Sequence, residues 1–288
     1  MNRCLLTAIA FLSLSTAALA APAADGNFDR KLSVSAQPDL YVSTGSGNIR
    51  VFAGAEGEVH VVGHVHAGWS AFGDINARIQ RIVDNPPITQ SGNTIKVGDA
   101  NDRSLFNNIS IDYEITVPAS VALNLHSGSG DVEVDHVGRY VSGQSGSGSV
   151  RLHGIHGPAE LESGSGDLEL EEEGAGDVKA RTGSGSIRIN GLNGGLMART
   201  GSGDIEANGH LQGPANLSSG SGSVRLHLSP DSHFNVEAST GSGSIRISFP
   251  GAPQQGDDSR HHLTGAVNGG GPALEVRTGS GDIDITPR

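Results

Sequence analysis

The glycine-rich turns are the first feature of the chain that could bind a ligand. Gly-Ser-Gly occurs nine times, and an aspartate follows it directly at Asp131, Asp167, Asp204 and Asp282. Calcium β-roll repeats also combine glycine turns with aspartate, but there the pattern returns every ~9 residues. Here the unit returns every 18–19 residues, and every second one carries serine. A hard cation needs six or more oxygen ligands, so we favour an electrostatic ladder between repeats over calcium sites.

An acidic run is the second candidate for chemistry. Glu169, Glu171, Glu172 and Glu173 are the densest group of carboxylates in the chain. Paired carboxylates on neighbouring coils of a β-helix can hydrolyse or cleave polysaccharides. The other interpretation is a solvated corner of the fold, flanked by Arg151 and Arg188, and we favour it.

Histidines are the third candidate. His60, His64 and His66 share one face of a predicted strand, and Val59, Val61 and Val65 share the other. Two histidines two residues apart on a strand can share zinc or copper, but a solvated strand face is favoured. His153/His156 and His261-His262 are weaker candidates. We therefore predict no metal, no cofactor and no catalytic residue, and the question of metal at the first three histidines stays open.

Phosphate-binding and hydrolase interpretations of the glycines fail on their context. Phosphate loops and dinucleotide folds need a helix directly after the glycines. A strand-like segment follows every Gly-Ser-Gly, and no Gly-x-Ser-x-Gly stands between a strand and a helix.

The spacing of the units predicts the architecture. From Gly128 the steps are 18, 18, 19, 18, 19, 21 and 38 residues, and a fixed period of this length is typical of stacked repeats. Each unit reads as a strand, the turn, a second strand and a corner. We predict an all-β fold, a parallel β-solenoid or β-helix of right-handed sense, with rungs of 18–19 residues. The predicted division of the chain is a signal peptide at 1–20, an irregular N-terminal β region at 21–120 and the solenoid at 121–288.

Side-chain parity assigns the interior of the solenoid. Alternate positions are aliphatic in both strands of each unit, as in Val132/Val134 after the turn and Leu123/Leu125 before it. The same parity selects a hydroxyl just before each turn, which we expect to hydrogen-bond inside the stack: Ser127, Ser145, Ser163, Thr182, Thr200, Ser219, Thr240 and Thr278. We expect the glycines to adopt left-handed backbone at these corners.

Charges on the outer face alternate from repeat to repeat. The sign changes at every step from Glu133 to Arg225, as expected if the repeats are neighbours in register, because opposite charges facing each other stabilise a sheet. The alternation fails between Arg225 and Arg246. After it, Leu263-Thr264-Gly265 stands where a turn is expected, so this is predicted to be the weakest part of the stack.

The N-terminal region reads as strands interrupted by one helix. Ile75, Ile79, Ile82 and Val83 lie at helical spacing, and Pro86-Pro87 ends the helix. Alternation predicts strands at Lys31–Ala36, Asp39–Ser43, Asn48–Phe52, Glu58–His66, Thr94–Val97 and Ile109–Val117.

The first residues predict export. A basic start, an apolar run over Leu5–Leu14 and Ala18-Leu19-Ala20 form a secretory signal with its cleavage site. Cys4, the single cysteine, is removed with it, so no disulfide or thiolate site is expected. The net charge of −12 disfavours nucleic acid and anionic membranes. We expect a periplasmic, extracellular or cell-surface protein without membrane insertion.

Three segments together resemble one known family. They are the Thr-Gly-Ser-Gly-Asp-Ile-type repeat, the stretch from Asn85 to Asn93 and the stretch from Ile109 to Pro118. The chain resembles the exported bacterial family of β-strand-repeat domains of unknown function labelled "putative adhesin". The resemblance covers nearly the whole mature chain and implies a β-helical fold in the cell envelope. It carries no catalytic residues over to this sequence.

These observations lead to a non-enzymatic function. We expect an exported envelope protein that presents a rigid β-solenoid for adhesion or for interaction with an envelope protein or polysaccharide. The alternative is a polysaccharide-active β-helix enzyme that uses carboxylates near Glu169–Glu173.

Overall fold

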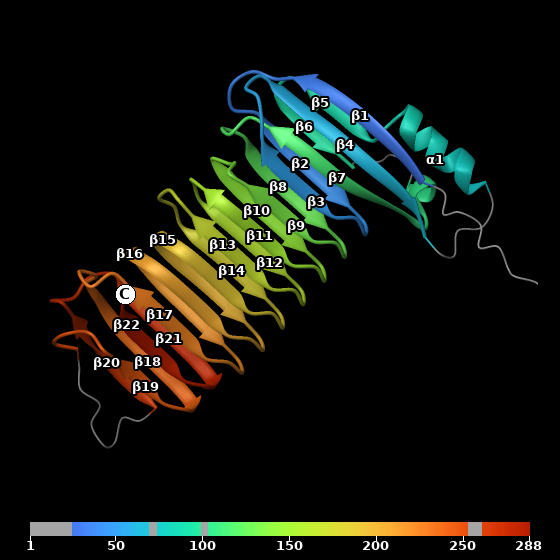
Figure 1. Cartoon of the computed structure of the whole chain (residues 1–288). Helices are drawn as coiled ribbons and strands as arrows, with labels where there is room; N and C mark the ends of the chain where they lie inside the picture. The colour runs from blue at the N-terminus through green and yellow to red at the C-terminus, as the bar shows by residue number, and fades with distance from the viewer. Residues whose placement is uncertain (1–24, 69–73, 99–102, 253–260) are drawn as a thin grey trace, which may run out of the picture.

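The computed structural model of the chain describes residues 25–68, 74–98, 103–252 and 261–288. The predicted signal segment 1–20 lies outside these ranges. Within them the chain is nearly all β, with one α-helix, and its strands stack into an elongated, mostly parallel ladder of two layers (Figure 1). The predicted all-β, solenoid-like fold is thus confirmed, whereas its right-handed sense and regular rung length stay predictions.

The first layer holds the strands that precede the Gly-Ser-Gly turns; strands without such a turn extend it at both ends and extend the second layer at its N-terminal end. From the N-terminal end of the ladder they are β5 (Ile88–Ser91), β6 (Thr94–Val97), β2 (Asp39–Thr44), β8 (Ala122–Ser127), β10 (Tyr140–Ser145), β12 (Ala159–Ser163), β14 (Val178–Thr182), the later parts of β15 (Ile187–Thr200) and β16 (Ile205–Ser219), β21 (Ala273–Ser280), β18 (Phe234–Ser242) and β20 (His262–Val267).

The second layer holds the strands that follow the turns. In the same direction they are β1 (Asp25–Ser33), β4 (Glu58–Ala67), β7 (Ile109–Val117), β3 (Ile49–Ala53), β9 (Val132–Asp135), β11 (Val150–Ile155), β13 (Leu168–Glu172), the early parts of β15 and β16, β17 (Val224–Leu228), β22 (Ile283–Pro287) and β19 (Ile245–Ile247).

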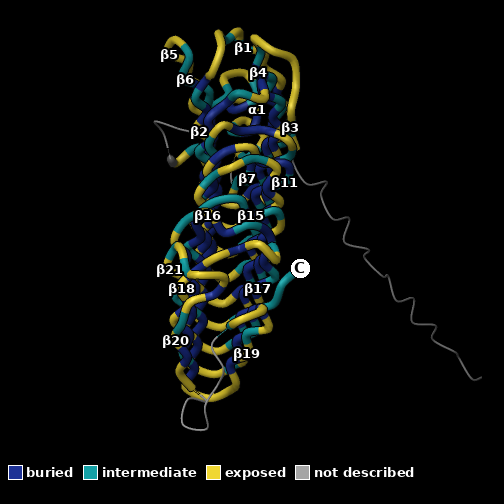
Figure 2. Tube along the Cα trace, turned by 90° about the vertical axis from the view of Figure 1, so that its left-hand side faces the viewer, coloured by how far each residue is buried: buried dark blue, intermediate teal, exposed yellow. Residues whose placement is uncertain are grey.

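The core lies between the two layers. Buried segments follow the inner side of the chain along the whole ladder (Figure 2). Every aliphatic position assigned to the core by parity is buried, apart from the half-buried Ile247. Because burial of a Val, Leu or Ile side chain contributes about 1.5–3 kcal/mol, these small side chains stabilise the stack with few aromatic residues.

The hydroxyl before each turn points inward, as predicted. Ser145 donates to the carbonyl oxygen of Gly130 in the preceding rung at 2.8 Å, and its oxygen accepts the N–H of Gly148 in its own turn at 2.9 Å. The same bond to the preceding rung recurs at Ser127, Ser163, Thr182, Thr200, Ser219, Thr278 and Thr240. Each hydroxyl therefore ties two rungs together and satisfies buried backbone groups.

The glycines of the turns have a different role from the one predicted. Of the glycines in the nine Gly-Ser-Gly units, only Gly243 and Gly281 have positive φ, so left-handed backbone does not explain the rest. Instead, a Cβ on Gly146 would lie 2.3 Å from the carbonyl oxygen of Gly128, and one on Gly164 would lie 2.2 Å from that of Gly146. Glycine is needed because each turn approaches the turn of the preceding rung too closely for a side chain.

The C-terminal rung lies out of sequence order. β21 pairs with β16 on one side and β18 on the other, and β22 pairs with β17 and β19. The last segment of the chain is thus inserted between two rungs that precede it in sequence. The predicted degenerate rung at Leu263-Thr264-Gly265 is instead β20, which runs antiparallel to β18 at the end of the first layer.

This insertion repairs the predicted break in the charge ladder. Asp284 lies between Arg225 and Arg246 in register, and the Arg246–Asp284 pair is 3.2 Å apart. At the other end, Arg50 lies between Glu114 and Glu133. Opposite charges therefore alternate without interruption along the second layer from β7 to β19, and the expected failure at Arg225 was wrong.

The N-terminal strands continue the ladder. β2 and β3 pair in parallel with β8 and β9, so the rung with Gly45-Ser46-Gly47 belongs to the same stack. Pairing therefore includes strands on both sides of residue 120, and the predicted domain division there stays a prediction. The first strand was misplaced: β1 spans Asp25–Ser33 because it pairs antiparallel along β4. The hairpin strand β5 was missed.

The predicted helix is confirmed as α1 (Ile75–Asp84). Ile79 and Ile82 are buried, and the helix ends just before Pro86-Pro87. It contacts β1 and β4 beside the N-terminal end of the ladder (Figure 1).

Glycine-to-alanine changes test the close approach between turns. Gly146→Ala should destabilise the protein by about 1–3 kcal/mol, since its Cβ would overlap a backbone oxygen that cannot move alone. Gly45→Ala is the matched control at the same position of another unit, where no atom lies within 4 Å of the added Cβ. Equal melting temperatures for the two variants would contradict the close-approach explanation.

A charge reversal tests the outer ladder. Arg188→Glu would place three acidic side chains in succession, because Arg188 lies between Glu169 and Glu206 in register. We expect a lower melting temperature, and a larger drop at low salt than at high salt because salt screens exposed charges. Ser202→Glu, which adds negative charge at an exposed turn, is the control. An unchanged melting temperature for Arg188→Glu at low salt would rule out the ladder.

Candidate functional site

The repeat aspartates bind the neighbouring rung. Oδ1 of Asp131 accepts the backbone N–H of Ser149 at 2.8 Å, and its other oxygen lies 3.2 Å from Arg151. Asp167, Asp204 and Asp282 accept the N–H of Ser186, Ser223 and Ser244 in the same way. The N–H of Ser223 is the main reason why the pKa of Asp204 lies below its ordinary value. The alternation of aspartate and serine thus has a structural cause.

The acidic run does not converge on one site. Glu169 lies in the outer charge ladder between Arg151 and Arg188, as expected for a solvated position. The exposed Glu171 lies 3.5 Å from His153. At the corner, the oxygens of Glu173 lie 3.8 and 3.6 Å from Nε2 of His136 and His156. The prediction of a solvated corner holds for these three glutamates.

Glu172 is the exception, because its side chain turns into the stack. It is 5% exposed, one carboxylate oxygen accepts the N–H of Asn193 at 3.3 Å, and the other has no hydrogen-bond partner. Burial raises the pKa of Glu172 to about 7; the nearby Asp177 also raises it, and the Asn193 N–H opposes the shift. The alternation of β13 places Glu172 on the same inward face as Leu168 and Leu170, although the sequence led us to expect it in a solvated corner.

The N-terminal histidines each contact a polar residue of β1. His60 lies 2.8 Å from Asp29, His64 lies 2.9 Å from Asn27, and His66 lies 3.1 Å from Asp25. The predicted alternation with buried Val59, Val61 and Val65 is confirmed. The structure does not bring these histidines together with His153/His156 or His261-His262. Within the described ranges, no group of three His, Cys, Asp or Glu side chains could hold a metal ion.

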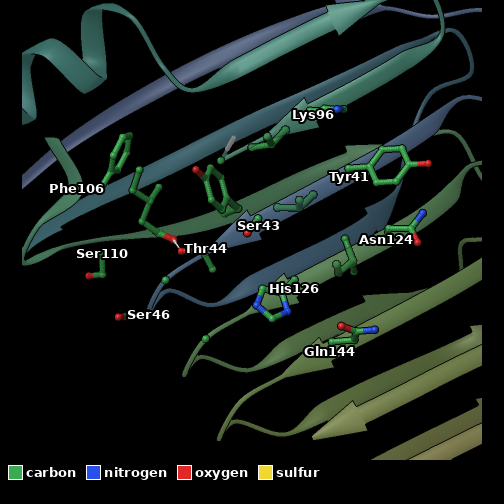
Figure 3. A pocket seen from close by; sticks show the side chains of 18 of the residues that line it. Tyr41, Ser43, Thr44, Ser46, Lys96, Phe106, Ser110, Asn124, His126 and Gln144 are labelled. Carbon is green, nitrogen blue, oxygen red and sulfur yellow. Dashed lines mark hydrogen bonds between the residues drawn. The ribbon is translucent and has the colours of Figure 1, made fainter. Parts of the chain in front are cut away.

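A large concave site lies where the ladder meets the N-terminal strands. This cavity of about 1300 Å³, here called the N-terminal groove, has a floor formed by the outward face of four neighbouring strands, β6, β2, β8 and β10. Lys96 and Tyr41 face each other in register across the first two of these strands, and Asn124, His126 and Gln144 follow on the next two (Figure 3).

The wall of the groove comes from an irregularity in the stack. The β6–β7 rung has no Gly-Ser-Gly turn; instead the chain runs through the 3-10 helix η1 (Arg103–Phe106), and the paired ends of β4 and β7 extend past the neighbouring turn. Phe106 and Ser110 therefore stand opposite the floor (Figure 3). Arg78 of α1 donates to the carbonyl oxygen of Leu105 at 2.7 Å, which fixes η1 in place. A hydrogen bond of 3.0 Å from Thr44 to the Ile111 carbonyl joins wall to floor.

Two properties distinguish this groove from the rest of the surface. Among the residues that the structure describes, no aspartate or glutamate lines it. In addition, within the described part of the chain, the polar ends of Tyr41, Lys96, Asn124, His126 and Gln144 have no hydrogen bond or ion pair. Elsewhere, side chains on such faces bind their neighbours in the next rung, as in Lys179–Glu160 at 2.6 Å and Gln212–Asn193 at 2.6 Å.

The sequence analysis missed this groove. Its floor comes from strands that are distant in sequence, and its wall depends on how far β4 and β7 extend. One signal was present: the units that precede Gly128 and Gly146 carry Asn124, His126 and Gln144 where the next two units carry charged residues.

Comparison with known proteins identifies the family. A sequence model of the family described as Toastrack DUF4097 matches residues 70–286, more than half of the chain. The chain belongs to the DUF4097 family. The predicted membership of a family of unknown function labelled as adhesins is thereby confirmed. No curated protein matches this DUF4097 chain in sequence.

Two solved structures resemble the DUF4097 protein at low identity. One is a putative cell adhesion protein from Clostridium sporogenes ATCC 15579, with 12% identity, a TM-score of 0.28 and coverage of 91% of this chain and 100% of that one. The other is a putative adhesin from Bacteroides fragilis NCTC 9343, with 14% identity, a TM-score of 0.41 and coverage of 91% and 97%.

Within the described ranges, no helix is long and apolar enough to span a lipid bilayer.

The buried Glu172 predicts a pH-dependent stability. Its pKa is raised in the folded state from an ordinary value of 4.5, so folding favours the protonated carboxyl. The stabilisation is complete below pH 4.5 and is lost as the pH rises through about 7. Glu172→Gln removes this loss, because its amide stays neutral. We therefore expect the variant to gain melting temperature relative to wild type at pH 8, and much less at pH 5.

The burial of Glu172 sets the size of the expected gain in stability, and an exposed glutamate provides the control. One pKa unit corresponds to about 1.4 kcal/mol, so a gain of a few kcal/mol at pH 8 is the upper limit. Glu162→Gln, at an exposed position of β12, should change the melting temperature equally at both pH values. If Glu172→Gln also shifts it equally at both, the buried carboxyl does not titrate as described.

Proposed function

We propose that this DUF4097 protein is an exported, non-enzymatic envelope protein that presents a rigid β-solenoid for adhesion or for interaction with a protein or glycan. One observation carries the proposal. Polar side chains along the stack bind one another from rung to rung, whereas the N-terminal groove gathers polar side chains that have no partner in the described part of the chain. Such groups are suited to binding another molecule.

The lining of the groove supports binding over catalysis. General acid–base chemistry needs a titratable group positioned at the reacting atoms. Among the described residues, the groove offers His126 and Lys96 but no carboxylate to act with them. Glu171 and Glu172, the neighbouring members of the acidic run, point to opposite sides of the sheet.

Export and the right-handed coil belong to the same proposal. The predicted signal at 1–20 and the family label support an envelope location. The hydroxyls before the turns satisfy buried backbone groups of the neighbouring rung, which supports a rigid ladder.

The proposal is tested by location and by capture. The native gene product, followed by cell fractionation, should be found in the envelope or outside the cell. The mature chain from Ala21, immobilised on beads, should enrich a defined envelope protein or glycan over beads carrying an unrelated exported β protein. A cytoplasmic location, or no enrichment of either class, would overturn the proposal.

One observation favours the enzymatic alternative. Glu172, with its pKa raised to about 7, could serve as a proton donor at neutral pH if substrate reached it. Turnover on a panel of polysaccharides that is lost in Glu171→Gln and Glu172→Gln would establish this alternative. We expect no turnover in either variant or in wild type.

A further inference from the structure

The unpaired side chains of the N-terminal groove specify a kind of ligand. Lys96 offers three donors, Asn124 and Gln144 each offer an amide donor and acceptor, His126 offers a ring nitrogen of each kind when neutral, and Tyr41 offers a hydroxyl. All five are free of partners within the described residues. A ligand rich in hydroxyl groups would satisfy donors and acceptors of both kinds.

The charge of the groove points to an anionic ligand. The chain has three lysines, of which Lys31 pairs with Glu58 at 3.1 Å and Lys179 pairs with Glu160 at 2.6 Å. Of the three lysines, only Lys96 has no ion pair in the described ranges, and no carboxylate among the described residues lines the groove around it. In a chain of net charge −12 this is a local site for a negative group.

The geometry of the floor suits a sugar chain. Neighbouring strands lie about 4.8 Å apart, which is comparable with the length of one pyranose ring, so each strand can meet one sugar. Tyr41 is 43% exposed, the one large apolar side chain among the described residues that is so open, and its ring can stack on a sugar face. Phe106 adds an apolar surface on the opposite wall.

The strand next to β10, which is β12, limits the length of an anionic ligand in the groove. Gln144 pairs in register with Glu162, and Ser142 with Glu160. A second, small hollow begins here, lined by these glutamates together with Lys179 and Arg181. A carboxylated chain would meet like charge past β10, so the groove accommodates a short acidic segment that spans β6 to β10.

We propose that the N-terminal groove binds a short carboxylated glycan, with one carboxylate on Lys96, a sugar ring on Tyr41, and hydroxyl groups on Asn124, His126 and Gln144. This assignment rests on the proposed interaction function and names its site and ligand class. Nucleic acid does not fit, because one lysine cannot neutralise a run of phosphates.

The test uses tetragalacturonate as the probe and isothermal calorimetry of the mature chain at low salt. Wild type should bind the probe and should not bind a neutral tetrasaccharide of equal length. Lys96→Met should weaken binding about tenfold, as expected for loss of a charged hydrogen bond, and Tyr41→Ala should weaken it by a similar factor. Lys31→Met is the matched control, a lysine outside the groove whose charge is already paired with Glu58, and should bind as wild type does.

The outcomes separate this assignment from the proposed function. If inorganic phosphate binds the groove as tightly as tetragalacturonate does and displaces it, the groove is an anion site only and the glycan assignment is wrong. Equal binding by wild type and Lys96→Met would place the glycan elsewhere. In both cases, capture of an envelope partner by the immobilised chain would still support the interaction function. Circular dichroism of each variant ensures that lost binding does not come from lost folding.

Discussion

The contact between successive Gly-Ser-Gly turns is the constraint on which the rest of the structure depends. At each turn a carbonyl oxygen of one rung comes very close to the first glycine of the next rung. A Cβ added to that glycine would lie only 2.2–2.5 Å from this oxygen in each stacked unit. The buried hydroxyl before the turn bonds to that same preceding rung. Together these contacts fix both the spacing and the register. Core columns, charge column and aspartate bonds all follow, because each requires neighbouring rungs to be aligned residue by residue.

Much of this arrangement could be predicted from the sequence. The period, the inward parity of Val132 or Leu152 and the inward hydroxyls depend on local alternation, which one sequence shows directly. The position of β21 and β22 in the ladder could not be predicted. The sequence of a strand that is inserted between two earlier strands looks the same as the sequence of a strand that simply follows them. Asp284 was the available clue, since it supplies the acidic residue that was missing between Arg225 and Arg246.

The candidate site was harder to predict than the fold. Its side chains come from strands on both sides of residue 120, and none belongs to a known motif. The site exists because one rung departs from the rule of the others: without a Gly-Ser-Gly turn between β6 and β7, the second layer extends past the first and leaves a wall beside an open face. The regular repeats supply stiffness, and the irregular rung supplies the hollow. Glu172 was missed for a different reason: the alternation of β13 turns it inward with Leu168 and Leu170, but a carboxylate is rarely buried without a partner.

The order of the C-terminal rungs has a consequence for how the molecule is completed. A ribosome delivers β18 and β19 before β21 and β22, yet the latter two separate β18 and β19 from β16 and β17. Without β21 and β22, β18 and β19 would lack the parallel neighbours that they have in this structure. Parallel pairing at this end of the ladder therefore depends on strands that lie later in the sequence.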